Sequence, residues 1–252
     1  SHIRIRLSEA QDLDENGSAG YKKSMVMVIF AIGLFALIYL PSWWAQKVLQ
    51  EHSVPRLDIR QNGSEFAASL LKHVEIEGVE IKPTAPSMDH YNPSTRQIGL
   101  SPDIHQGRTL TAIVAAAHEV GHAIQHAEGY WLLEARSRLV ILAQKLEKTG
   151  SIILVAAPFV GLITRNPKVS VLMAGFMLGT VLATTLVHLV TLPMELDASF
   201  KKAMPYLKEV EYIHERDLQG AKKILTACAL TYLATSLRSL LNIWRWLRIL
   251  RR

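Results

Sequence analysis

The five-residue motif His-Glu-Val-Gly-His at residues 118–122 constrains the fold of this chain more than any other stretch. It lies in a proline-free, alanine-rich run over residues 110–123, which is typical of a buried helix. Residues four apart on a helix share one face, so His118 and His122 can bind one Zn²⁺ together. Glu119 then lies beside the open coordination position, where a general base for water belongs. The motif therefore predicts a zinc-binding helix.

A catalytic zinc site needs a third protein ligand, for which the sequence offers three candidates. His126 is the nearest, but on a straight helix it stands about 12 Å along the axis from His118, too far to share an ion. Glu195 is preferred, because it follows a long apolar block and a proline that ends or bends a helix. Asp197 points away from the Glu195 face and is the weaker alternative. A solvated carboxylate without a ligand role remains the other interpretation of Glu195.

Four apolar blocks predict transmembrane helices. The chain has 252 residues, of which 49% are hydrophobic, and about twenty consecutive apolar residues cross a bilayer. The blocks lie at 24–44, about 147–164, about 169–192 and 223–244, and the first is expected to be a retained anchor. The alternative interpretation of each block is a buried core helix.

The net charge of +6 is explained by positive residues that flank the apolar blocks. The basic, aromatic segment 245–252 suits the anionic surface of a membrane, so we expect the lipid bilayer as a partner and no nucleic acid. Positive residues border both predicted faces, so the charge pattern leaves open which face carries the zinc site.

Two short strands are expected between the first apolar block and the motif, at 79–82 and 96–100, with turn chemistry at 89–95 between them. An oxyanion formed during hydrolysis would need a hydrogen-bond donor. The side chains with suitable chemistry are Tyr91, His105, Arg108 and Tyr232. For each of them a structural role is the simpler interpretation.

Further blocks around the motif carry a family resemblance. They are Asp89–Pro93 with Arg96, Leu100–Pro102, Gly107–Arg108, Ala116–His126, Leu189–Ser199, Gly220–Leu225 and Leu230–Tyr232. Over roughly residues 60 to 245, the chain resembles the YugP-type membrane zinc metallopeptidases of bacteria. Its layout is also similar to that of the HtpX-type membrane proteases. Those proteases often carry Asp four residues after the ligand Glu, where this chain has Ser199.

The resemblance implies a mainly α, multi-pass membrane protein of the plasma membrane. Its zincin-like, more narrowly gluzincin-like, core would combine the motif helix with a small β element and about four transmembrane helices. The domain order would be an N-terminal tail (1–23), a transmembrane helix (24–44), the first part of the zinc domain (45–138), a transmembrane hairpin (139–192), the second part with the ligand Glu (193–222), a fourth transmembrane helix (223–244) and a basic tail (245–252).

The implied function is a zinc-dependent endopeptidase that acts on polypeptides, with a role in membrane protein quality control. His118, His122 and Glu195 would bind Zn²⁺, and Glu119 would be the base. His126 and Ser199 are candidates for orienting the ligands, and a membrane partner or a second copy of the chain is a candidate for controlling access. Two other functions remain open: a zinc-containing membrane scaffold or assembly subunit without peptidase activity, and a transport role.

Overall fold

The computed structural model describes residues 25–29, 32–33, 35–36, 39–164, 166–209 and 213–230. The chain divides into two compact units, Ser1–Leu40 and Pro41–Arg252, and the elements below all belong to the second. The predicted tails at 1–23 and 245–252 lie outside the described residues, as does most of the predicted span 223–244.

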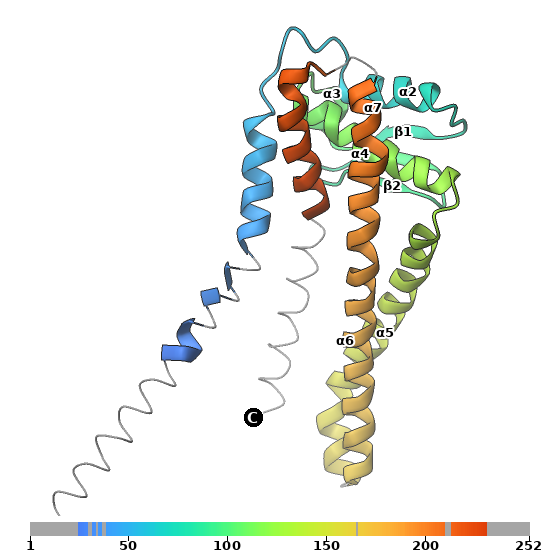
Figure 1. Ribbon diagram of the computed structural model, residues 1–252. Helices are drawn as coiled ribbons and strands as arrows, with labels where there is room; N and C mark the ends of the chain where they lie inside the picture. The colour runs from blue at the N-terminus through green and yellow to red at the C-terminus, as the bar shows by residue number, and fades with distance from the viewer. Residues whose placement is uncertain are drawn as a thin grey trace, which may run out of the picture. The chain divides into compact units, whose positions relative to one another are not determined.

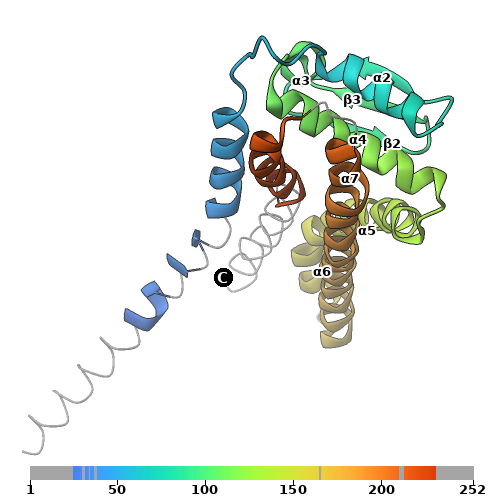
Figure 2. The ribbon, with the colours of Figure 1, turned by 45° about the horizontal axis from the view of Figure 1, so that its top comes forward.

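Helix α4 (Leu110–Ala127) is the centre of the second unit and is buried from Leu110 to Gln125. It begins at Thr109, whose hydroxyl accepts a hydrogen bond from the backbone N–H of Ala112 at 3.0 Å. Figure 2 shows α4 between α2 and the sheet on one side and the segment that follows α6 on the other. Both imidazoles of the motif therefore lie in the interior.

A three-stranded sheet packs near α4. Its strands are β1 (Glu80–Pro83), β2 (His90–Asn92) and β3 (Gln97–Leu100), in the order β1-β3-β2. Strand β1 is parallel to β3, and β2 is antiparallel to it, with Tyr91 opposite Ile98. The sequence predicted a turn over the whole of 89–95, but β2 forms there because pairing with β3 overrides local turn preference.

Helix α2 (Gly63–His73) shows why these residues fold as they do. The Asn62 side chain accepts from the backbone of Glu65, whose own side chain accepts from the backbone of Asn62. The apolar residues Phe66, Leu70 and Leu71 share one face of the helix and are buried. That face packs against α4 and so helps to fix the motif helix in place.

Helices α5 (Trp131–Thr164) and α6 (Pro167–Leu196) form a long antiparallel hairpin (Figure 1). A π-helix, Asp197–Ala203, continues directly from α6. The shorter elements are α3 (Pro102–Gln106), α7 (Met204–Glu209), a 3₁₀ helix (Glu215–Asp217) and a helix over 218–230. The hairpin returns the chain to α4, so residues after 192 lie against the motif helix.

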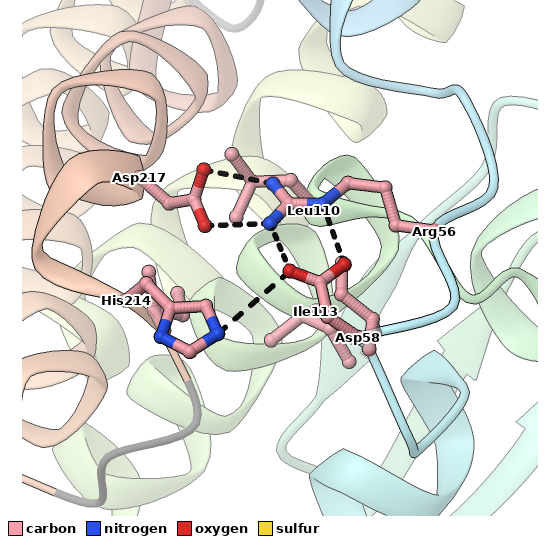
Figure 3. Close-up of a pocket in the computed structure, with 8 residues that line it drawn as sticks. Arg56, Asp58, Leu110, Ile113, His214 and Asp217 are labelled. Atoms are coloured by element: carbon pink, nitrogen blue, oxygen red, sulfur yellow. Dashed lines mark hydrogen bonds and ion pairs between the residues drawn. The ribbon is translucent and has the colours of Figure 1, made fainter.

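An ion-pair cluster joins two distant parts of the unit (Figure 3). The Arg56 guanidinium donates to both oxygens of Asp217, at 2.7 and 2.9 Å, and also to both oxygens of Asp58. Arg216 donates to Asp58 at 2.7 Å. The hydrogen bonds from Arg56 hold the pKa of the Asp58 carboxyl well below its usual range. The cluster fixes the loop before α2 to the 3₁₀ helix that precedes helix 218–230.

The structure is mainly helical, but the prediction of a multi-pass membrane protein is wrong. In the described part of the chain, no helix is both long and apolar enough to cross a bilayer. The first half of α5 carries charged residues, including Glu134, Arg138 and Lys145, and the apolar block 169–192 lies in α6, which packs along α5. Apolar runs occur in membrane spans and in paired helices alike, and hydropathy alone does not separate the two.

Candidate metal centre

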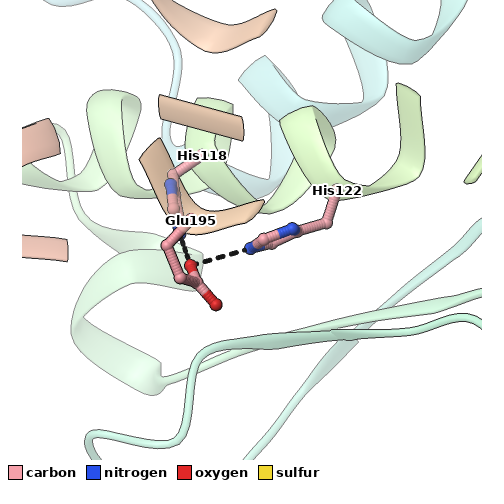
Figure 4. A group of neighbouring side chains, drawn as sticks. All are labelled: His118, His122 and Glu195. Carbon is pink, nitrogen blue, oxygen red and sulfur yellow. Dashed lines mark hydrogen bonds and ion pairs between the residues drawn. The ribbon is translucent and has the colours of Figure 1, made fainter. Parts of the chain in front are cut away.

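Two helices meet end to side at the motif. Helix α4 presents His118 and His122 from one face, and the last turn of α6 presents Glu195 (Figure 4). Pro193 lies inside that last turn, where it removes one backbone donor from the helix. The motif residues and Glu195 are therefore brought together by the hairpin, across more than seventy residues of sequence.

The three side chains point at one another. The Nε2 atoms of His118 and His122 each lie 3.1 Å from Oε2 of Glu195. The ligand atoms of all three groups lie within 4.8 Å of one another, and all three residues are buried. Two imidazole nitrogens and a carboxylate oxygen are the donor set of a catalytic zinc site.

The Nδ1 atom of each imidazole already makes a hydrogen bond within the protein. Nδ1 of His118 lies 3.0 Å from Oγ of Ser199, which donates its own hydrogen to the carbonyl of Leu225 at 3.2 Å. Nδ1 of His122 donates to Oε1 of Gln125 at 3.0 Å. In the neutral imidazole only one nitrogen carries hydrogen, so both Nε2 atoms present lone pairs to Glu195.

Converging lone pairs repel one another unless a cation lies among them, so these residues fit Zn²⁺. Two carboxylate oxygens support this fit. Oε1 of Glu195 and Oε2 of Glu119 are buried and have no hydrogen-bond partner among the described residues. Buried polar atoms are normally paired, so both oxygens point to a ligand at this place.

The electrostatics of the cluster favour a cation as well. Burial acts to raise the pKa of Glu195, but the charge of His122 and hydrogen bonds from both imidazoles lower it well below its usual range. Burial acts to lower the pKa of His122, but the charge of Glu195 outweighs it and raises the pKa to about 9, so without a bound cation a proton on Nε2 takes the cation's place beside Glu195. Burial raises the pKa of Glu119, which the two imidazoles only partly oppose. The centre therefore holds Glu195 ionised and makes Glu119 a stronger base than an exposed carboxylate.

The close approach of the two segments depends on a glycine. A Cβ added at Gly121 would lie 2.6 Å from the carbonyl oxygen of Ala198 in the π-helix. The backbones of α4 and the π-helix are therefore in direct contact, one turn from Glu195. Gly121 occupies a variable position of the motif, so the motif alone does not reveal this contact.

Of the other residues that the sequence suggested for the site, some lie at the centre and some do not. Ser199 is at the centre, through its contact with His118. Tyr91 and His126 pair with each other instead, with the Tyr91 hydroxyl 2.8 Å from Nδ1 of His126. Arg108 is exposed, and Tyr232 lies outside the described residues.

The alternative ligand Asp197 and the oxyanion-donor candidate His105 also lie apart from the three side chains that converge. Asp197 accepts a hydrogen bond from Gln125 rather than joining Glu195. His105 is half-buried at the end of α3.

The sequence interpretation missed Gln125. This side chain is fully buried, lies three residues after His122 and contacts both His122 and Asp197. One signal was available: a polar residue on the buried face of an apolar helix needs a partner.

Comparison with known proteins agrees with this centre. Residues 26–251 match the sequence pattern of the family described as "Putative neutral zinc metallopeptidase". The chain is 30% identical over 228 residues to a Bacillus subtilis (strain 168) protein named "Putative membrane protease YugP", and the match covers 88% of this chain and 94% of that protein. No solved structure matches the chain. The predicted resemblance is thus confirmed, and Zn²⁺ is the metal that the family implies. The chain belongs to the neutral zinc metallopeptidase family.

Proposed function

We propose that this protein is a zinc-dependent endopeptidase in which His118, His122 and Glu195 bind the metal and Glu119 is the general base. The convergence of two Nε2 lone pairs on an ionised, buried carboxylate carries the proposal. Family membership supports the reaction class, since the family is described as a metallopeptidase.

Bound zinc would supply Lewis acidity, which acidifies water and polarises the scissile carbonyl. The residues of the chain do the rest. Glu119 takes the proton on Oε2, which has no hydrogen-bond partner among the described residues, and passes it to the leaving amine. Its raised pKa suits both steps, because a carboxylate with an ordinary pKa holds a proton too weakly at neutral pH.

The test separates metal binding from hydrolysis. Zinc content and cleavage of unfolded casein are measured for the wild type, Glu119→Gln and Glu195→Ala. We expect Glu119→Gln to keep about one zinc per chain and to lose cleavage by a factor of about 10² or more, because general base catalysis contributes at least that much. We expect Glu195→Ala to lose both zinc and cleavage.

Glu134→Gln is the matched control, because Glu134 is exposed and pairs with Arg138 on its own helix, away from the centre. Its zinc content and cleavage should equal those of the wild type. Full turnover by Glu119→Gln would remove Glu119 as the base. Zinc in the wild type without any cleavage would instead favour a protein that keeps zinc for structure.

A further inference from the structure

Gln125 makes three hydrogen bonds that leave it only one orientation. Its Nε2 donates to the carbonyl oxygen of Met194 at 2.9 Å and to Oδ2 of Asp197 at 2.8 Å. Both partners are acceptors only. If the amide were reversed, its Oε1 would face the carbonyl oxygen of Met194 and Oδ2 of Asp197, and neither contact would be a hydrogen bond. Oε1 is therefore the atom that faces His122, at 3.0 Å.

This orientation determines which nitrogen of His122 carries hydrogen. Since Oε1 accepts, Nδ1 donates, and Nε2 is left to face Glu195 with its lone pair. Asp197 in turn holds the amide in place, and it is 6% exposed. Hydrogen-bond partners of this kind fix the ring orientation of a metal-binding histidine.

The same side chain also holds the segment that carries the third ligand. Met194 and Asp197 stand on either side of Glu195, and Gln125 bonds to both. One residue of α4 therefore fixes His122 on its own helix and the Glu195 segment at the end of α6. Neither contact follows from the motif.

We propose that Gln125 and Asp197 are positioning residues of the zinc centre, with Asp197 orienting Gln125 and Gln125 orienting both His122 and the Glu195 segment. The inference rests on the proposed zinc-binding function. It assigns roles to two residues outside the ligand set and the base.

The first test measures zinc affinity by competition with a chelator, and thermal unfolding of the metal-free protein, for Gln125→Met. This change keeps the length of the side chain and removes all three hydrogen bonds. The matched control is Gln61→Met, because Gln61 is a partly buried amide that donates to Ser69 at 3.0 Å, away from the centre. We expect Gln125→Met to bind zinc 10–100-fold more weakly than the control.

A pair of substitutions tests whether Asp197 acts on the zinc centre through its hydrogen bond with Gln125. Gln125→Glu keeps an acceptor for His122 but places a carboxylate against Asp197, so zinc affinity should fall. Asp197→Asn in the same chain provides an amide donor for the introduced carboxylate, and we expect the double variant to recover about tenfold of the lost affinity. Asp197→Asn alone should have a smaller effect, since the amide oxygen that it introduces can still accept from Gln125.

The outcomes distinguish this inference from the proposed function. If the wild type binds zinc and cleaves casein while Gln125→Met binds zinc as tightly as Gln61→Met, the positioning role is overturned and the proposed function stands. Additive effects of the two substitutions, without recovery, would overturn the role of Asp197. A wild type that binds no zinc would overturn both proposals.

Discussion

Ser199 is a neutral residue that supports one of the two imidazoles of the centre. Its oxygen accepts from Nδ1 of His118, because its own hydrogen is used on the carbonyl of Leu225. A serine therefore provides the acceptor that a carboxylate would otherwise supply, and it does so without adding negative charge. Since the residue is fully buried, water cannot replace it in the folded protein.

Replacing this acceptor should weaken metal binding. We expect Ser199→Ala to reduce zinc affinity about tenfold or more, because the His118 ring loses the bond that orients it. Zinc affinity would be measured by chelator competition, beside Ser137→Ala. Ser137 donates to a carbonyl of its own helix, so its loss should leave the zinc affinity unchanged. Equal affinity in both variants would show that His118 is oriented by other contacts.

At the residue scale, the sequence predicted the groups that meet but not what orients them. Helical spacing placed His118 and His122 on one face. Pro193 was expected to end or bend the helix before Glu195, but α6 continues through it to Leu196. The contacts of Gln125 and Ser199 join segments more than sixty residues apart, and no local pattern encodes such pairs. The sequence left the support from Ser199 open, because a serine cannot supply a carboxylate, but a hydroxyl whose hydrogen is engaged elsewhere can accept from His118.

At the scale of elements, the contact between α4 and the π-helix determines where Glu195 lies. Gly121 allows the two backbones to touch at Ala198. Ala117, one turn before Gly121 on the same face of α4, is a small residue that is fully buried as well. π-Helical turns occur frequently at functional sites, and this one begins two residues after Glu195.

A methyl group at this contact should push the elements apart. We expect Gly121→Ala to lower the free energy of unfolding by about 1–3 kcal/mol and to weaken zinc binding as the Glu195 segment moves. Gly179→Ala is the matched control, because no atom of the described part of the chain lies within 4 Å of its added Cβ. In the middle of α6, that change should instead stabilise the protein by about 0.5–1 kcal/mol. Urea unfolding measures the change in the free energy of unfolding for both variants. Changes of the same sign would contradict the close contact at Gly121.

The predicted spans show the limit of hydropathy at this scale. The apolar blocks at about 147–164 and about 169–192 lie within helices α5 and α6, although they were identified by their length and lack of charge and not by a helical period. What those helices do with their apolar residues was not readable, because a partner helix and a lipid tail present the same chemistry. The pairing of α5 with α6 brings together side chains that are far apart in the sequence.

At the scale of the whole molecule, the proposed zinc centre links α4, which precedes the hairpin, to the end of α6. Removing the metal should therefore lower stability throughout the second unit. At zinc concentrations 100-fold above the dissociation constant, binding adds about 2.7 kcal/mol to the free energy of unfolding. We expect a strong chelator to lower the melting temperature by about 5–10 °C in a protein of this size. The melting temperature of Glu195→Ala should not respond to the chelator, and an equal response would place the metal elsewhere.

The Arg56 cluster should make stability depend on pH in a defined direction. The folded-state pKa of Asp58 is lowered, chiefly by the hydrogen bonds from Arg56. Its contribution is thus fully present above the unfolded-state pKa of about 3.9 and is lost as the pH falls toward the folded-state value. We expect Asp58→Asn to be less stable than the wild type at pH 7, with the difference shrinking below about pH 4. Urea midpoints from pH 3 to 7 measure it, and a difference independent of pH would contradict this origin.

The order of the site along the chain has a consequence for synthesis on the ribosome. The histidines are made first, Glu195 follows 73 residues after His122, and the carbonyl that engages Ser199 belongs to Leu225. At about 5–20 residues per second, some 4–15 seconds separate the emergence of His122 from that of Glu195. Throughout that interval the nascent chain displays a histidine pair without its carboxylate. The arrangement delays assembly of the centre, and with it the proposed peptidase activity, until α5 and α6 have emerged and paired.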